Sequence, residues 1–442
     1  MIKSRKTKNA MALICLTFLL SITLSGCCII QLGGVKSAQI NENGELVLEY
    51  SGGREQNLGK VVGDDGKDGK DGLDGMDGED GKDGENTTEE DNGDSNGSQI
   101  IITPSQTTDI EAAASKGILS AVSIKCGSQL GSGVIYELDK ATGDALIVTN
   151  YHVAYLASTG AVSNSYSVYL YGAEMDGQAI SAEYVGGSMN YDLAVLRVRN
   201  SSALKQSNAV AATVANSDEV NAGTTAIAIG NARGLGISVT TGVISVDSEY
   251  LTMKGADNKT AINIRVMRID TAVNTGNSGG GLFDDEGNLI GIVNAKMVVE
   301  NVENIGYAIP SSTVISFVEN VKANCLDTSN QRIRLANVLD VTSSNSMAVI
   351  DKDTGSIRIE ETVVVTTPAS GYLVRGTLQS GDIITEISVN GEEVLKITRA
   401  YQVDDICLGL KEGDRITVYY TRNGASYTDS FEVTASYIAY VK

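Results

Sequence analysis

The sequence predicts a mainly β protein. Gly is frequent (48 residues) and Pro is scarce (3), and Tyr (18) outnumbers Phe (4). Short runs rich in Val, Ile and Thr recur between Gly, Asn and Ser, a pattern typical of strands joined by turns. A hydrophobic fraction of 42% is enough for packed cores, and the length of 442 residues predicts about two to three domains.

The N-terminus reads as an export signal. Basic residues at positions 3, 5, 6 and 8 precede an apolar stretch at 12–24, which is too short for a comfortable membrane span. The stretch ends in Leu24-Ser25-Gly26-Cys27, which resembles a bacterial lipobox. We therefore expect residues 1–26 to be a lipoprotein signal peptide, and a lipid on Cys27 to anchor the exported protein at the extracytoplasmic face of the cell membrane. An ordinary signal peptide or an uncleaved anchor is the alternative.

Two short segments follow the signal. Residues 27–62 predict a small β segment, with strands near 38–40 and 45–50 around a hairpin-like turn at 41–44. Residues 63–108 predict a stalk or linker. Gly occupies every third position from Gly63 to Gly84, the period of collagen, yet no Pro is present and Asp fills the third place of all seven complete triplets. An acidic flexible stalk and a short trimeric collagen-like bundle both fit this pattern.

Residues 109–325 predict an all-β barrel or sandwich domain. Short strand-like runs, separated by turn residues, occur at 121–125, 132–136, 146–149, 167–171, 193–198 and 225–229. A closing helix is expected at 311–323, because Pro310 precedes it and apolar residues recur at Val314, Ile315, Val318 and Val321.

Residues 330–438 predict a separate, small module. Strands are expected at 363–365, at 381–394 with a turn at Asn390-Gly391, and at 416–420.

The composition excludes several classes of function. The net charge of −21 argues against a nucleic-acid partner, because phosphate binding needs clustered Lys and Arg. The single His rules out a His-rich metal site, and no Cys spacing fits zinc. Cys126, Cys325 and Cys407 are far apart in sequence and are expected to be buried free thiols. No metal and no cofactor is predicted.

Three residues together indicate nucleophilic catalysis. His152 is the only imidazole of the chain, Asp192 precedes an apolar run, and Ser278 lies in Gly276-Asn277-Ser278-Gly279-Gly280. A serine hydroxyl needs a base within reach, and the base needs a partner that fixes its tautomer. The order His, Asp, Ser along the chain is that of chymotrypsin-type proteases. We expect Gly276, Asn277 and Ser278 to form the oxyanion hole, with the N–H groups of Gly276 and Ser278 as the natural donors.

The chain resembles the HtrA family of serine proteases over residues 110–320. The matching segments are TNYHV (149–153), DLAV (192–195), AIGN (228–231), TTGVIS (240–245), DTAVNTGNSGG (270–280), GNLIGI (287–292) and GYAIPS (306–311). The resemblance implies a trypsin-like double β-barrel followed by a PDZ-like α/β domain. It also implies His152 as base, Asp192 as its orienting partner and Ser278 as nucleophile.

The same resemblance implies partners and binding sites. Substrates would be unfolded or damaged envelope proteins or peptides, and the protease domain would assemble as a homotrimer. The specificity pocket is expected at Asn294, Ala295, Lys296, Ile305 and Gly306. The peptide-binding loop of the PDZ-like domain is expected at Leu335, Ala336, Asn337 and Val338.

Two functions are carried forward. The first is an exported serine endopeptidase that works through a Ser-His-Asp acyl-enzyme. The alternative is a protease fold without catalysis, acting as a chaperone or PDZ scaffold at the cell surface.

Overall fold

The structure, a computed structural model, describes residues 35–40, 45–50, 55–60, 109–173, 178–295, 305–350, 352, 355–366 and 378–441. The signal peptide, Cys27, the repeat of residues 63–108 and Lys296 lie outside these residues. The chain divides into two compact units, 1–98 and 99–442, which are described separately. Among the described helices, none combines the length and apolar character that a membrane crossing requires.

The first unit contains a three-stranded antiparallel sheet in the order β1-β2-β3, and the turn expected at 41–44 lies outside the described residues. Its strands are β1 (Val35–Ile40), β2 (Glu45–Tyr50) and β3 (Glu55–Lys60).

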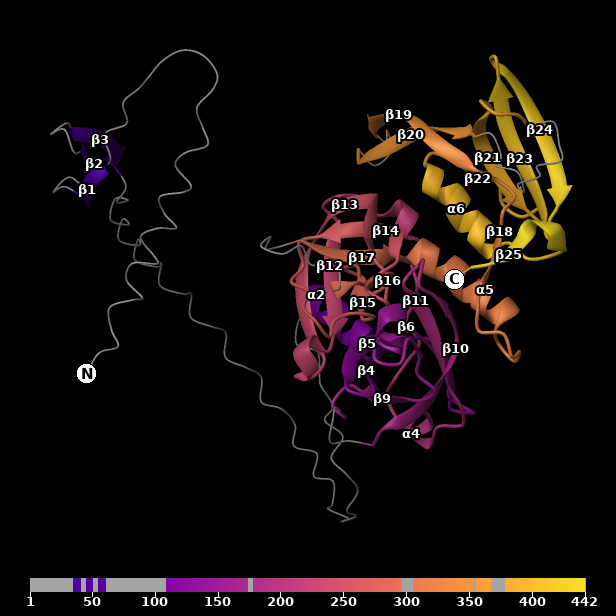
Figure 1. Ribbon diagram of the computed structural model, residues 1–442, viewed down its shortest axis with the longest axis horizontal. Coiled ribbons are helices and arrows are strands. Elements are labelled where there is room, and N and C mark those ends of the chain that lie inside the picture. The colour runs from indigo at the N-terminus through magenta and orange to yellow at the C-terminus, as the bar shows by residue number, and fades with distance from the viewer. Residues whose placement is uncertain are drawn as a thin grey trace, which may run out of the picture. The chain divides into compact units, whose positions relative to one another are not determined.

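Two closed β-barrels form the first part of the second unit, here called the barrel part (Figure 1). The first barrel has the strand order β10-β11-β6-β5-β4-β9. Its strands are β4 (Ala121–Cys126), β5 (Gln129–Asp139), β6 (Asp144–Asn150), β9 (Tyr166–Leu170), β10 (Ile180–Ser188) and β11 (Leu193–Val198). A hairpin of β7 (Tyr155–Leu156) and β8 (Ala161–Val162) lies outside the barrel.

The second barrel has the strand order β12-β13-β14-β17-β16-β15. Its strands are β12 (Thr225–Gly230), β13 (Ser238–Lys254), β14 (Ala261–Ile269), β15 (Gly281–Phe283), β16 (Leu289–Val293) and β17 (Gly306–Pro310). Five of the six predicted strand runs fall wholly within strands of the two barrels, the run at 167–171 extends one residue beyond β9, and the predicted mainly β fold is confirmed.

The barrels are held together by side chains that alternate along their strands. In β6, Ile147 joins the core of the first barrel, whereas its neighbour Val148 joins an apolar cluster shared with the second barrel and α5. Leu196 and Val195 in β11 divide in the same way. Because successive residues of a strand point to opposite faces, one run of apolar residues can supply both cores.

Helices cover the barrels at their ends. The expected closing helix is α5 (Ser311–Asn324), which begins directly after Pro310. Helix α2 (Asp109–Ile118) was not predicted, although its acidic first turn and Lys116 in its last turn are typical of a helix. The short helical segments are α3 (Tyr151–Ala154), α4 (Ser202–Gln206), η1 (Ser217–Glu219) and η2 (Ala232–Gly234).

The C-terminal module is a β-sheet with one long helix. The sheet runs β19-β20-β21-β23-β24, with β22 beside β21, and a separate pair joins β18 to β25. Its elements are β18 (Arg334–Ala336), β19 (Val341–Ile350), β20 (Ile357–Val365), β21 (Ile383–Val389), β22 (Leu395–Lys396), α6 (Ala400–Gly409), β23 (Arg415–Arg422), β24 (Ala425–Glu432), η4 (Ala435–Tyr437) and β25 (Ile438–Tyr440). The predicted turn is present: Asn390 and Gly391 both have positive φ. Helix α6 was not predicted.

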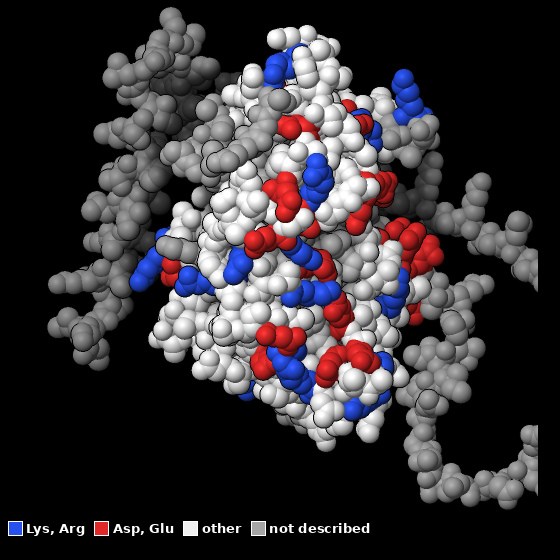
Figure 2. Space-filling model, turned by 90° about the vertical axis from the view of Figure 1, so that its right-hand side faces the viewer, with Lys and Arg blue, Asp and Glu red and all other residues white. Residues whose placement is uncertain are grey.

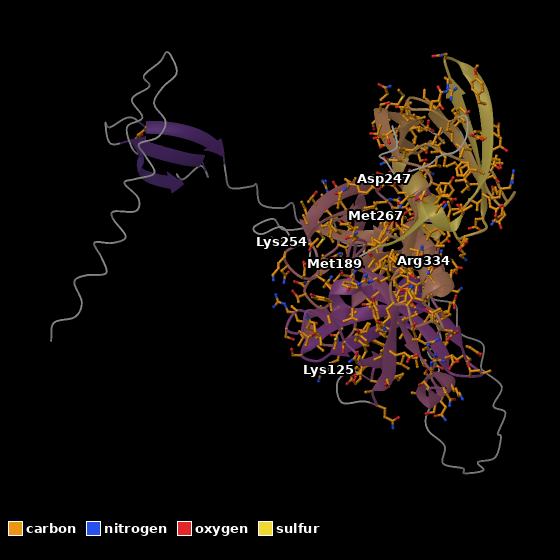
Figure 3. All side chains as sticks on the ribbon, turned by 45° about the vertical axis from the view of Figure 1, so that its right-hand side comes forward. Lys125, Met189, Asp247, Lys254, Met267 and Arg334 are labelled. Carbon is orange, nitrogen blue, oxygen red and sulfur yellow. The ribbon has the colours of Figure 1, made fainter. Side chains whose placement is uncertain are left out.

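Helix α6 attaches the module to the barrel part by packing against α5 (Figure 1). At this contact Arg265 of β14 is 5% exposed and forms ion pairs with Asp405 of α6 and, at 2.9 Å, with Asp218 of η1. Its guanidinium carbon lies 3.3 Å from the centre of the Tyr401 ring. Figure 3 places Asp247 and Arg334 along the same junction, where Asp247 accepts a 2.8 Å hydrogen bond from Arg399.

Replacing Arg265 with alanine is expected to destabilise the second unit by about 3–5 kcal/mol, because it leaves the buried Asp405 and the half-buried Asp218 without their cation. Urea unfolding followed by circular dichroism measures the loss, since the chain has no Trp. The control is Arg199→Ala, whose side chain is 57% exposed beside Glu183. There we expect at most about 1 kcal/mol. Equal effects of the two substitutions would contradict the buried network.

The three thiols of the second unit are free and buried, as expected. Burial raises the pKa of Cys126, that of Cys325 to about 11 and that of Cys407 to about 12. Since the thiolate is the reactive form, the native protein should resist iodoacetamide at these positions and react at all three once unfolded. Mass spectrometry of the modified peptides reads each site separately. Rapid labelling of native Cys407 would contradict the burial.

Charges of both signs alternate on the face shown in Figure 2, without a continuous basic patch there. The excess of acidic residues does not make this face uniformly acidic.

Candidate active site

His152 and Asp192 are brought together by neighbouring strands. His152 lies in α3, directly after β6, and Asp192 directly precedes β11, which pairs with β6 so that Leu193 faces Asn150. The two oxygens of the Asp192 carboxylate have different partners. Oδ2 lies 2.7 Å from the imidazole Nδ1, and Oδ1 accepts the backbone N–H of His152 at 2.9 Å. This grip fixes both the position and the rotation of the imidazole.

The backbone at Asp192 is held as firmly as its side chain. Its φ of 49° lies in the left-handed region, and its carbonyl accepts hydrogen bonds from the backbone N–H of Tyr151 at 3.0 Å and from the Asn150 amide at 3.1 Å. Asp192 is 2% exposed. A buried carboxylate with this many donors suits the task of orienting a base.

Asn294 is a further partner of Asp192 and does not take its predicted place in the specificity pocket. Its side-chain amide donates to Oδ2 of Asp192 at 2.8 Å, and the residue is buried. Its neighbour Ala295 instead lines a hollow beside Ser278. Neighbouring residues of an extended chain point to opposite sides, so only one of the two can face the hollow.

The turn that carries Ser278 requires glycine at the next position. Gly279 has a φ of 84°, and a Cβ there would lie 2.2 Å from both the Ser132 carbonyl and the Thr149 hydroxyl. The carbonyl of Ser278 accepts the backbone N–H of Ser132 at 2.8 Å. The turn is therefore pressed against strands β5 and β6, which fixes the serine relative to His152.

Of the three residues expected in the oxyanion hole, two have a backbone N–H group that no described residue occupies and that is free to bind an oxyanion. The N–H of Asn277 donates to the Asn274 carbonyl at 2.9 Å and is therefore engaged. Among the described residues, the N–H groups of Gly276 and Ser278 have no acceptor. The carbonyl of Gly276 accepts the Ser132 hydroxyl at 2.7 Å, which holds this peptide unit in one orientation. The loop therefore offers two backbone donors, and Asn277 supports them.

His152 and Ser278 both line two hollows. One hollow also includes Ala256, Val273 and Ala295, and the other includes Leu130 and Arg233. No hydrogen bond between His152 and Ser278 is found in the described part of the chain, and such contacts are often long before substrate binds.

The other predicted pocket residues lie elsewhere. Gly306 packs against Val273 from behind, where a Cβ would meet the Val273 side chain at 2.8 Å. Ile305 packs against the apolar cluster that both barrels share. Lys296 is outside the described residues. Sequence reasoning missed Val273, and the available signal was its position three residues before Gly276 of the Gly-Asn-Ser turn.

The segment predicted as a PDZ peptide-binding loop does not have the required free donors. Leu335 and Ala336 belong to β18, which pairs with β25. The N–H of Asn337 donates to the Tyr437 carbonyl at 2.8 Å, and that of Val338 donates to Ala336. A carboxylate-binding loop needs unpaired N–H groups.

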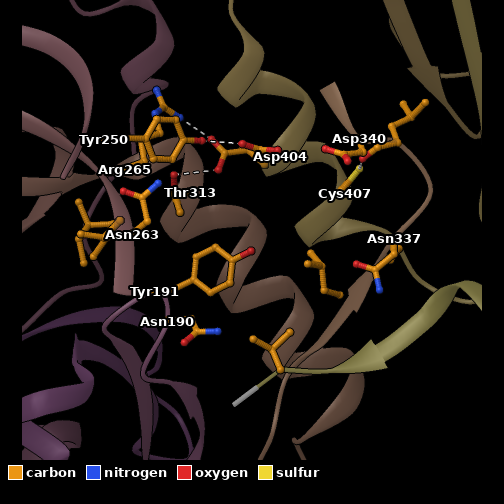
Figure 4. Close-up of a pocket in the computed structure, with 17 residues that line it drawn as sticks. Asn190, Tyr191, Tyr250, Asn263, Arg265, Thr313, Asn337, Asp340, Asp404 and Cys407 are labelled. Atoms are coloured by element: carbon orange, nitrogen blue, oxygen red, sulfur yellow. Dashed lines mark hydrogen bonds and ion pairs between the residues drawn. The ribbon is translucent and has the colours of Figure 1, made fainter. Parts of the chain in front are cut away.

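The hollow beside this segment is also unsuited to a peptide carboxylate. Asp340, Asp404 and Asp405 line it, together with Arg265, Tyr191 and Tyr250 of the barrel part (Figure 4). Because Arg265 already pairs with Asp405 and Asp218, a chain terminus entering here would meet more carboxylates than free cations.

Removing the Asn294 amide is expected to lower kcat while leaving KM unchanged. A hydrogen bond to a charged group is worth enough that Asn294→Ala should reduce kcat about tenfold to a hundredfold. Asn294→Ser keeps a donor and should recover part of the loss. Steady-state kinetics on one peptide separates the two parameters. A raised KM with normal kcat would instead indicate that Asn294 contacts the substrate, as the sequence predicted.

The fold and this cluster define a serine endopeptidase built on two trypsin-like barrels. Residues 131–292 match the model of the trypsin-like peptidase domain. The Do-like serine protease HtrA of Lactococcus lactis subsp. lactis (strain IL1403) is 32% identical over 320 residues, which cover 70% of this chain and 71% of that one. The Do-like HtrA of Bacillus subtilis (strain 168) is 37% identical over 191 residues, covering 43% and 38%.

The chain belongs to the HtrA family of serine proteases. The solved HtrA-type protease AlgW with a tripeptide is 25% identical and covers 73% of this chain and 96% of its own, at a TM-score of 0.44. The names of these relatives give no support to the non-catalytic alternative.

Proposed function

We propose that this chain is an exported endopeptidase that cleaves unfolded or damaged envelope proteins through Ser278, His152 and Asp192. The observation that carries the proposal is the pair of hydrogen bonds between the Asp192 carboxylate and His152, whose side chain lines the same hollow as Ser278. An imidazole held in this way has one tautomer and one direction, which is what a serine requires of its base.

The chemistry follows from these positions. Ser278 attacks the scissile carbonyl as His152 takes its proton, and Asp192 stabilises the imidazolium that forms. The N–H groups of Gly276 and Ser278 receive the oxyanion. His152 then gives the proton to the leaving amine, and water, activated by the same imidazole, hydrolyses the acyl-enzyme. No cofactor takes part in this scheme.

The acyl-side residue of the substrate would enter the hollow lined by Ala256, Val273 and Ala295. Its apolar lining residues have small side chains, its polar ones include Asn274 and Thr275, and no Lys, Arg, Asp or Glu lines it among the described residues. It therefore favours Ala, Val, Ile or Leu before the scissile bond.

Cleavage of one protein in folded and unfolded form tests this proposal. Reduced, carboxymethylated ribonuclease should be degraded, and the native disulfide-bonded form should be spared. Mass spectrometry of the fragments should show aliphatic residues before the cut. Equal degradation of both forms, or charged residues before the cut, would contradict the proposed substrate class.

We propose that the N-terminal region anchors and spaces the protease. A lipid on Cys27 would attach the protein to the membrane, and residues 63–108 would hold it at a distance. The basis is sequence alone: the lipobox-like end of the apolar stretch and a repeat in which Asp occurs in each of seven triplets. Mass spectrometry of the mature N-terminus should find a lipid-modified Cys27, and an unmodified terminus elsewhere would overturn the anchor.

We propose a homotrimeric assembly through the barrel part, as the family resemblance implies. Light scattering on the purified chain should give three times the mass of one copy. A monomeric mass at the concentration of the activity assay would contradict it.

A further inference from the structure

The second hollow beside Ser278 has a lining unlike the first. It is bordered by Leu130, Val153, Arg233, Gly234 and Gly276, and Arg233 is the only Lys, Arg, Asp or Glu among its described lining residues. A substrate lying across Ser278 has its acyl side in one hollow and its leaving-group side in the other. Because the proposed function places the acyl side in the hollow lined by Val273 and Ala295, the leaving-group side meets Arg233 in the other hollow.

The backbone of Arg233 is fixed against the oxyanion loop. Its φ of 57° is left-handed, and its N–H donates to the Thr275 carbonyl at 2.8 Å. Gly276 is packed so closely that a Cβ would lie 2.3 Å from the Asn231 carbonyl and 2.7 Å from the Arg233 nitrogen. The backbone from which the Arg233 side chain extends is therefore fixed beside the oxyanion loop.

The Asn231 side chain holds this loop from the other side. Its amide donates to the Ser123 hydroxyl at 2.9 Å, and its Oδ1 accepts the N–H of Gly236 at 2.9 Å. These bonds close residues 231–236 into a rigid turn on strand β4. A charge carried by such a turn is presented to each substrate at the same place.

The charge of Arg233 is not neutralised by the described part of the chain. The side chain is exposed, and no carboxylate among the described residues forms an ion pair with it. The chain has a net charge of −21, so a cation that lies beside the nucleophile without an ion-pair partner among the described residues differs in sign from most of the protein's charge. Its natural complement is an anionic group on the substrate.

We propose that Arg233 is a specificity-determining residue, which selects Asp or Glu among the first three residues after the scissile bond. The inference rests on the proposed function and names a substrate class for it: segments with an aliphatic residue before the cut and an acidic residue after it. Leu130 and Val153 would contact the stem of that acidic side chain.

The expected preference for an acidic residue is small, because the Arg233 side chain is exposed to solvent. An exposed ion pair supports about a fivefold preference for Glu over Gln, equivalent to about 1 kcal/mol. The preference should shrink as salt rises, because screening weakens exposed pairs first.

Quenched fluorescent peptides test the inference. Each peptide has the same acyl side, taken from a fragment of carboxymethylated ribonuclease, and carries Glu, Gln or Lys at one of the three positions after the cut. The readout is the ratio of kcat/KM for Glu over Gln, at low and high salt. The variants are Arg233→Gln, Arg233→Lys and Arg233→Glu. The matched control is Arg415→Gln, which makes the same charge change on the exposed Arg415 of β23.

The wild type and the Arg415→Gln control should give a ratio of about five at low salt for at least one position. Arg233→Lys should keep most of it, Arg233→Gln should bring it to about one, and Arg233→Glu should make Lys the preferred residue. A wild-type ratio near one at every position, or an unchanged ratio in Arg233→Gln, would overturn the inference while leaving the protease intact. Absence of cleavage of every peptide would overturn the proposed function, and the inference with it.

Discussion

Replacing Ser278 with alanine is expected to lower kcat by roughly a millionfold, because the acyl-enzyme can no longer form. The oxyanion donors at Gly276 and the hollows beside the serine remain, so substrate should still bind with nearly normal affinity. Steady-state cleavage of a fluorescent peptide measures kcat. Titration of the inactive variant into the same peptide, followed by the change in its fluorescence on binding, measures affinity. Ser426→Ala, an exposed serine of β24, is the matched control and should retain wild-type activity.

The double variant Ser278→Ala, His152→Ala provides an internal check. Residues that act as one catalytic unit lose activity non-additively, so the second substitution should cost almost nothing more. A further loss of several orders of magnitude would mean that His152 and Ser278 act independently, against the proposed mechanism.

Replacing His152 with alanine is expected to be as damaging as the loss of Ser278, since no other imidazole exists in the chain. Asp192→Asn should cost about ten-thousandfold in kcat. An amide cannot accept from both Nδ1 of the imidazole and the backbone N–H of His152, and its own NH₂ would meet the Asn294 amide. The imidazole is then held in the wrong tautomer.

Circular dichroism of each variant confirms that the fold is retained, and the same peptide assay gives the rates. Asp327→Asn is the matched control for the aspartate, because that exposed side chain pairs with Arg197 of β11 and with Arg199, which directly follows β11. Proteolysis by His152→Ala within tenfold of the wild type would contradict the assignment of the base.

The catalytic residues could be predicted from sequence because each lies in a short segment with a recognisable pattern of its own. The strand runs at 146–149 and 193–198 end and begin beside His152 and Asp192, and pairing of β6 with β11 brings the two residues together. The turn at Ser278 could be predicted from its glycines, because Gly276 and Gly279 adopt the positive φ that favours glycine. The helix after Pro310 was predictable for a similar reason, since a proline start and an apolar stripe are both read locally.

Other features depend on contacts between distant segments. Closure of the second barrel pairs β12 with β15 and β14 with β17, and no local pattern specifies such partners. Asn294 and Ala295 could not be told apart in sequence, because which of the two faces Ser278 depends on the register of β16. The loop at 335–338 was placed by resemblance alone, and its N–H groups pair with a strand about 100 residues later.

A single adduct tests the account most directly. A fluorophosphonate reacts only with a serine that is activated by a base and faces an oxyanion hole. We expect one phosphonyl group per chain, mapped by mass spectrometry to Ser278, absent from Ser278→Ala and strongly reduced in His152→Ala. A folded chain that degrades unfolded protein yet carries no label on Ser278, or carries it on another serine, would contradict the proposed active site.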